Sequence, residues 1–233
     1  MFRAWAQGLA ASAPSRCSIC HAWPARPVCE ACVQRFAQPQ PRCLRCALPV
    51  PLGVAECGAC VQAPGELDAC HAAVSYAYPW AGLVGRFKFR GEADWAAALA
   101  LLMRSAPWFE PTLEAADLVL PMPLAPARLR ERGFNQALEL ARRLAPAKVD
   151  ARLLLRVRDT LPQSALKRAE RLRNVDGAFA VEPLRASVVV GRSFVLVDDV
   201  MTSGASLQSA ARALRQAGAS RVTALVLART DED

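Results

Sequence analysis

From residue 71 onward, apolar and polar positions follow strand and helix periods in alternation. The predicted strands are residues 73–78, 117–120, 194–197 and 221–228. The predicted helices are residues 92–104, residues 134–145 and a segment around residues 207–214. Strands that are apolar throughout and separated by helices predict an α/β domain with a mainly parallel sheet.

The region before residue 71 follows neither period, and cysteine is its regular feature. Eight of the nine cysteines form four CxxC pairs, and the ninth, Cys70, is expected to be a small buried residue where the second domain starts. The paired residues are Cys17, Cys20, Cys29, Cys32, Cys43, Cys46, Cys57 and Cys60. Two such pairs complete a closed tetrahedral site, so four pairs predict two structural zinc ions. Sequential pairing closes shorter loops than interleaved pairing and is mildly favoured.

The choice between zinc and disulfides depends on the compartment. Residues 1–14 lack the Leu- and Val-rich centre of a signal peptide, and the longest apolar run, 95–103, is too short to span a bilayer. These features predict a cytoplasmic protein without membrane insertion, where reduced thiols favour zinc. The expected domains are an N-terminal tail over 1–14, a zinc-binding module over 15–65 and the α/β domain over 68–233.

Charge is concentrated in one part of the chain. Residues 128–173 hold thirteen Lys and Arg against five Asp and Glu, which accounts for the whole net charge of +8. Such a basic segment attracts phosphates, either on nucleic acid or on a small ligand. A solvated helix face is the alternative explanation.

The strand at 194–197 runs directly into Asp198 and Asp199, and a loop of small residues follows. The loop residues are Thr202, Ser203, Gly204, Ala205 and Ser206. Their backbone N–H groups can converge on a phosphate, and the N-terminus of the next helix adds partial positive charge. Two carboxylates would repel a phosphate alone, but they suit sugar hydroxyls or a Mg²⁺ ion beside it. A surface turn with two chance carboxylates is the alternative.

Polar residues also follow the strand at 117–120, after a Pro-Met-Pro turn and around a helix start. They are Arg128, Arg130, Arg132, Asn135 and Gln136. The arginines can pair with a pyrophosphate. Further candidates for contact with pyrophosphate or nucleic acid are Lys88, Arg90, Gln163, Arg168, Arg171 and Asn174. Three nearby aromatic residues, Phe87, Phe89 and Phe134, are suited either to stacking on bases or to core packing.

The segment from Phe194 to Ser206 resembles the phosphoribosyl pyrophosphate (PRPP) signature of type I phosphoribosyltransferases. The resemblance implies that Asp198 and Asp199 are the catalytic pair at the ribose hydroxyls, and that Thr202 to Ser206 hold the 5′-phosphate. It further implies pyrophosphate contact after the Pro-Met-Pro turn and a mobile hood around residues 163–174.

From Cys17 to Ala228, the order of motifs is similar to that of the ComF family. Membership would imply a double zinc ribbon before a type I phosphoribosyltransferase-like domain. It would also imply a role in natural transformation: handling single-stranded DNA in the cytoplasm with DNA-processing partners. Some members are named for gluconate utilisation instead.

Two classes of function follow. One is a DNA-handling protein that keeps a site for PRPP or another ribose 5-phosphate ligand. The other is a Mg²⁺-dependent phosphoribosyltransferase acting on an unidentified small-molecule acceptor in nucleotide or gluconate-related metabolism. The sequence shows no recognisable acceptor pocket, so turnover stays open.

Overall fold

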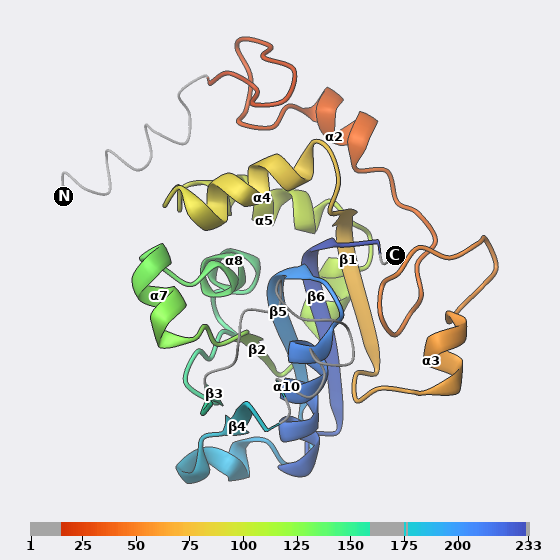
Figure 1. Cartoon of the computed structure of the whole chain (residues 1–233), viewed down its shortest axis with the longest axis vertical. Coiled ribbons are helices and arrows are strands. Elements are labelled where there is room, and N and C mark those ends of the chain that lie inside the picture. The colour runs from red at the N-terminus through yellow and green to blue at the C-terminus, as the bar shows by residue number, and fades with distance from the viewer. Residues whose placement is uncertain (1–14, 159–174, 176, 232–233) are drawn as a thin grey trace. The chain divides into compact units, whose positions relative to one another are not determined.

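The chain folds into two compact units in a computed structural model that describes residues 15–158, 175 and 177–231. The first unit extends to Gln38 and the second begins at Pro39 (Figure 1). The predicted boundaries at residues 14, 65 and 68 stay predictions. No helix among the described residues is long and apolar enough to cross a bilayer.

The first unit, over its described residues 15–38, has little regular structure. An antiparallel bridge joins Ser15 to Ala25, and one helix, α2, spans Glu30–Phe36. The chain between them turns sharply at His21, whose φ of 62° lies in the left-handed region. The buried residues at the centre of this unit are Cys17, Val28 and Cys32.

The second unit is built on a four-stranded sheet in the order β1-β6-β5-β2, with every neighbouring pair parallel (Figure 1). The strands are β1 (Ala69–Ser75), β2 (Leu118–Pro121), β5 (Ser193–Met201) and β6 (Arg221–Arg229). This confirms the α/β prediction of a mainly parallel sheet. The carboxyl end of β2 lies beside the middle of β5, because Pro121 pairs with Val197, and β5 continues through Asp198 and Asp199 to Met201.

Helices cover both faces of this sheet. Alternate residues of β5 and β6, such as Phe194 and Val222, share a core with α10, which spans Ala205–Gln216. The opposite face packs against α5 (Trp95–Arg104), α6 (Phe109–Ala115) and α8 (Gln136–Leu144). The other helices are α3 (Gly58–Gln62), α4 (Trp80–Phe89), α7 (Pro126–Arg132) and the 3-10 helix η2 (Pro183–Val188).

A short antiparallel pair completes the described fold. It consists of β3 (Leu154–Arg156) and β4 (Phe179–Val181). The predicted hood lies between these strands in sequence. Its candidate residues Gln163, Arg168, Arg171 and Asn174 are outside the described residues.

The sequence placed the first strand four residues too late. β1 begins at Ala69 and ends at Ser75, whereas 73–78 was predicted. The alternation continues past the strand end, but the Ala77 N–H donates to the Ser75 carbonyl at 2.8 Å and closes a turn. Tyr78 is consequently exposed rather than part of the sheet.

Candidate functional site

Each compact unit contains one cluster of four cysteines. The first is Cys17, Cys20, Cys29 and Cys32, and the second is Cys43, Cys46, Cys57 and Cys60. Within each cluster the sulfur atoms all lie within 4.8 Å of one another. The grouping confirms sequential pairing, and all nine cysteines are free thiols. Each cluster could therefore hold one zinc ion and fits the double zinc ribbon.

The two clusters repeat one backbone arrangement. In the first, the His21 N–H donates to the Cys17 carbonyl at 2.9 Å, and in the second the Ala47 N–H donates to the Cys43 carbonyl at the same distance. His21 and Ala47 both have positive φ, 62° and 55°. This turn bends the chain around the sulfur atoms, so the fold itself brings the thiols together.

Backbone donors also prepare the sulfur atoms for a cation. The N–H groups of Cys29 and Cys57 donate to Sγ of Cys17 at 3.4 Å and to Sγ of Cys43 at 3.3 Å. Burial alone would raise the pKa of both acceptor thiols, but backbone N–H donors outweigh it and lower them to about 6 and about 7. Burial and neighbouring thiols instead raise the pKa values of Cys32, Cys46 and Cys60, so Cys17 and Cys43 are the thiols most readily deprotonated. The fit to a zinc ion rests on the convergence of four sulfur atoms in each cluster.

Elemental analysis of the protein purified under reducing conditions is expected to give close to two zinc ions per chain. Changing Cys43→Ser and Cys46→Ser together should remove one of them, because each closed site needs four ligands. Thiol titration in denaturant should find all nine cysteines reduced. Less than one zinc per chain, or bridged cysteines between residues 17 and 60, would contradict the assignment.

The small-residue loop lies where the sequence predicted it, between β5 and the N-terminus of α10. Gly204 is the N-cap of α10 and has φ of 75°, in the left-handed region. The positive φ favours glycine, and a Cβ at Gly204 would stand 2.3 Å from Met201 Cε, so the end of the Met201 side chain would have to move for any other residue. The loop thus presents its backbone at a helix N-terminus, as phosphate binding needs.

The two carboxylates before this loop share an environment with basic side chains. Asp199 is 6 % exposed, and its Oδ1 atom lies 2.9 Å from Nζ of Lys88 on α4. Burial and the adjacent Asp199 carboxylate raise the pKa of Asp198 to about 7, while Lys88 and Arg132 act in the opposite direction. The fold therefore brings residues from β5, α4 and α7 into one electrostatic site.

Arg132, at the end of α7, also organises the neighbouring strand end. Its guanidinium lies 5.3 Å from the ring centroid of Phe89 and donates to Oε1 of Gln136 at 3.1 Å. Asn135 caps α8 through Oδ1, and its Nδ2 donates to the Met122 carbonyl at 3.0 Å. These bonds hold the Pro-Met-Pro turn against the start of α8.

The other candidates are more scattered. Arg128 and Arg130 lie on α7, and Arg90 is the C-cap of α4. In the described part of the chain, none of these three joins the Lys88–Asp199 ion pair. Within the basic segment, Arg142 and Arg143 both pair with Glu139, so part of its charge is neutralised on the surface of α8.

The three phenylalanines divide between core and surface. Phe87 is fully buried and packs 5.4 Å from the half-buried Phe134, so the core-packing alternative holds for Phe87. Phe89 is 67 % exposed beneath the Arg132 guanidinium. It is the residue of the three that is available for stacking.

Sequence reasoning missed the Lys88–Asp199 ion pair and a groove of about 410 Å³ beside the Pro-Met-Pro turn. Neither leaves a local pattern, because both depend on how α4, α7 and α8 pack around the sheet. The groove is lined by Pro121, Pro123, Leu124, Leu129, Phe134, Asn135, Leu138, Glu139, Arg142 and Ala151.

Proteins that are similar in sequence to this chain support this architecture. Residues 129–233 match the phosphoribosyl transferase domain family. The chain is 32 % identical over 209 residues to the DNA utilization protein YhgH of Salmonella typhimurium, covering 87 % of this chain and 90 % of that protein. It is 28 % identical over 210 residues to Competence protein F of Haemophilus influenzae, with the same coverage. The chain belongs to the ComF family.

A third ComF-family relative covers less of the molecule. Competence protein ComFC of Bacillus subtilis is 34 % identical over 149 residues, which are 63 % of this chain and 58 % of that protein. This ComF-family chain thus combines two N-terminal Cys₄ clusters with a phosphoribosyl transferase domain that is built on a mainly parallel sheet.

Proposed function

We propose that this chain is a cytoplasmic competence-type protein that handles single-stranded DNA and binds PRPP, or another ribose 5-phosphate ligand, at Asp198–Ser206. The names of its relatives, DNA utilization protein and Competence protein F, support the DNA role. The single observation that best supports a strand-binding surface is Phe89, exposed beneath a guanidinium and next to Lys88 in sequence.

The PRPP part rests on the strand end of β5. Asp198 and Asp199 offer acceptors for the ribose hydroxyls, and the loop from Thr202 to Ser206 offers backbone N–H groups to the 5′-phosphate. A Mg²⁺ ion bound with PRPP would neutralise pyrophosphate charge beside these carboxylates. Lys88, which holds Asp199 at 2.9 Å, keeps positive charge at the same place.

The DNA part rests on the surface formed by α4 and α7. An exposed aromatic ring binds any base by stacking, and a guanidinium over the ring adds a cation–π contribution. Arg128, Arg130 and Arg132 concentrate positive charge on one short helix beside it, and this charge attracts backbone phosphates. This surface and the phosphate loop meet at the Lys88–Asp199 ion pair, so a strand and PRPP are expected to compete.

The alternative is a phosphoribosyltransferase with a small-molecule acceptor. The groove beside the Pro-Met-Pro turn favours it, because it combines apolar walls with Asn135, Glu139 and Arg142. Catalysis would be electrostatic: the basic side chains would stabilise departing pyrophosphate while the acceptor attacks the ribosyl carbon. Pyrophosphate release from PRPP without DNA would support this alternative.

Changing Phe89→Ala is expected to weaken binding of a single-stranded oligonucleotide by about 5- to 150-fold, because one stacked base contributes roughly 1–3 kcal/mol. Fluorescence anisotropy over a range of salt measures the affinity. Since Phe89 has no charge, the log–log salt slope should stay the same.

Changing Arg128→Gln and Arg130→Gln together should instead reduce the slope of the log–log salt plot by roughly 1.4, at about 0.7 per phosphate contact.

Matched controls lie elsewhere in the chain. Phe36 in the first unit also has an arginine over its ring, with Arg35 5.2 Å from the ring centroid, but Phe36 is half-buried, so Phe36→Ala serves as the control for removal of an aromatic group from the zinc-binding module. Arg142→Gln with Arg143→Gln removes two charges that already pair with Glu139. If Phe36→Ala weakens binding and Phe89→Ala does not, the DNA lies on the zinc-binding module. No binding near physiological salt would favour the transferase.

A further inference from the structure

The second cysteine cluster is built into the sheet that supports the phosphate loop. The knuckle from Cys43 to Cys46 passes beside β1, where the Cys70 N–H donates to the Leu44 carbonyl at 2.7 Å. Ala47, directly after the knuckle, is fully buried in the same core as α10. The cluster thus shares packing with the element that forms the phosphate site.

One buried guanidinium connects the knuckle to the loop. Arg229, at the end of β6, is 1 % exposed. Its Nε donates to the Cys46 carbonyl at 2.9 Å, and a terminal nitrogen donates to the Met201 carbonyl at 3.3 Å. Met201 is the last residue of β5 and directly precedes Thr202. A buried arginine needs such acceptors, because an unpaired buried charge is strongly destabilising.

The side chain of Met201 continues this connection into the loop. Its sulfur lies 3.4 Å from Sγ of Cys70. Its terminal methyl group lies against Gly204, where a Cβ would stand, so Met201 packs on the loop. A displacement of the knuckle would therefore reach the phosphate loop through Arg229 and Met201.

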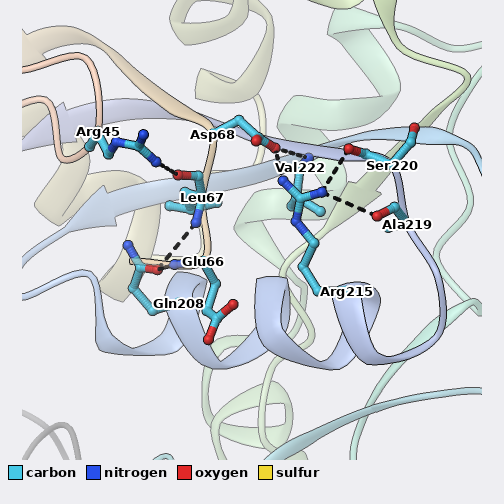
Figure 2. Close-up of polar contacts among 9 residues, drawn as sticks. All are labelled: Arg45, Glu66, Leu67, Asp68, Gln208, Arg215, Ala219, Ser220 and Val222. Atoms are coloured by element: carbon cyan, nitrogen blue, oxygen red, sulfur yellow. Dashed lines mark hydrogen bonds and ion pairs between the residues drawn. The ribbon is translucent and has the colours of Figure 1, made fainter. Parts of the chain in front are cut away.

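A second connection reaches α10 one turn after the loop (Figure 2). Arg45, inside the knuckle, donates to the Leu67 carbonyl at 3.2 Å. Oε1 of Gln208 accepts from the backbone N–H groups of Glu66 at 2.6 Å and Leu67 at 3.3 Å. The Gln208 N–H in turn donates to the Gly204 carbonyl at 2.9 Å. The segment after the second cluster is thus fixed to the first turn of α10.

We propose that metal in the cluster of Cys43, Cys46, Cys57 and Cys60 positions the phosphate loop, with Arg229 and Gln208 as the positioning residues. Metal retention at this cluster and affinity for PRPP are then coupled. By linkage, each raises the other by the same factor. The proposal rests on the proposed PRPP site, but it assigns to the metal a role in ligand binding in addition to folding.

The test measures how zinc partitions at equilibrium between the full-length, zinc-loaded protein and a competing chromogenic chelator, with and without saturating PRPP and Mg²⁺. We expect PRPP to raise the zinc affinity of the second cluster by at least about fivefold, the lower end of common coupling factors. A Cys17→Ser, Cys20→Ser variant lacks the first site, so its zinc partition reports on the second cluster. Calorimetric titration with PRPP provides the affinity of each variant.

Variants of Gln208 separate positioning from folding. Gln208→Ala should weaken PRPP binding and abolish the protection of zinc, whereas Gln208→Glu keeps Oε1 and should retain both. Arg229→Lys keeps the charge but loses the guanidinium that donates to both the Cys46 and the Met201 carbonyls. Its effect on PRPP binding and on zinc protection should therefore resemble that of Gln208→Ala. The matched control is Arg212→Ala, which removes an exposed 3.1 Å ion pair between α10 and Glu66 and should leave coupling unchanged.

The outcomes distinguish the two proposals. If the parent protein binds PRPP but its second cluster has the same zinc affinity with and without it, the coupling is wrong and the PRPP site stands. If Gln208→Ala retains the coupling of the parent, the positioning role is wrong, whether or not Arg229→Lys folds. If the parent does not bind PRPP at all, both proposals fail.

Discussion

Replacing Asp198 and Asp199 together by alanine is expected to weaken PRPP binding between about a hundredfold and about ten-thousandfold. Each carboxylate is assigned to hydroxyl or Mg²⁺ contacts, and a charged hydrogen bond contributes about 1.5–3 kcal/mol. Calorimetric titration with PRPP and Mg²⁺ measures the loss. A double variant that binds as tightly as the parent would exclude this strand end as the ribose site.

The packing of Asp199 dictates the control for that experiment. Asp199 pairs with Lys88, whose side chain is itself mostly buried, so Asp199→Ala leaves an ammonium group without its partner. Adding Lys88→Met removes the ammonium group that has lost its partner. We expect the triple variant to recover stability in urea denaturation but to bind PRPP more weakly than Lys88→Met alone, because Lys88 is itself a candidate pyrophosphate contact. Binding equal to that of Lys88→Met would mean that misfolding, rather than lost ligand contacts, caused the defect.

Gly204→Ala is expected to lower the free energy of unfolding by about 1–5 kcal/mol. The positive φ of 75° accounts for roughly 1–2 kcal/mol, because a Cβ is strained in the left-handed region. Overpacking adds up to roughly 3 kcal/mol, depending on how far the flexible end of the buried Met201 side chain moves away from the new Cβ. Urea denaturation measures the total, and PRPP binding should fall with it.

Gly191 provides the matched comparison. Its φ is 73°, but a Cβ there would meet no heavy atom within 4 Å. Gly191→Ala should therefore show only the conformational part, roughly 1–2 kcal/mol. Equal losses at the two glycines would show that Met201 moves aside freely and does not constrain the loop.

The parts of the site that depend on neighbours in sequence were predictable. The CxxC spacing predicted which cysteines share a cluster. The apolar run predicted a strand directly before Asp198, although β5 continues through both carboxylates to Met201. The small residues from Thr202 predicted the loop and the start of α10. Each of these features is encoded within a short stretch of chain.

The parts that depend on tertiary packing were not predictable. Arg229 bonds to a carbonyl 183 residues away, and nothing near either residue in sequence indicates the contact. Lys88 was predicted to contact pyrophosphate or nucleic acid, but no local pattern indicated its ion pair with Asp199 on another element. Such contacts follow from the order of strands in the sheet, which periodicity alone does not specify.

The position of the second knuckle has a consequence for solubility. β1 is an edge strand, and the unpaired N–H and C=O groups of an edge are a template for pairing with another chain. Here the Leu44 carbonyl takes up the outward Cys70 N–H, and Arg42 and Gln40 donate to Oγ of Ser75 at the other end of the strand. A metal-bound knuckle therefore also shields this edge, and loss of the metal would open it to aggregation.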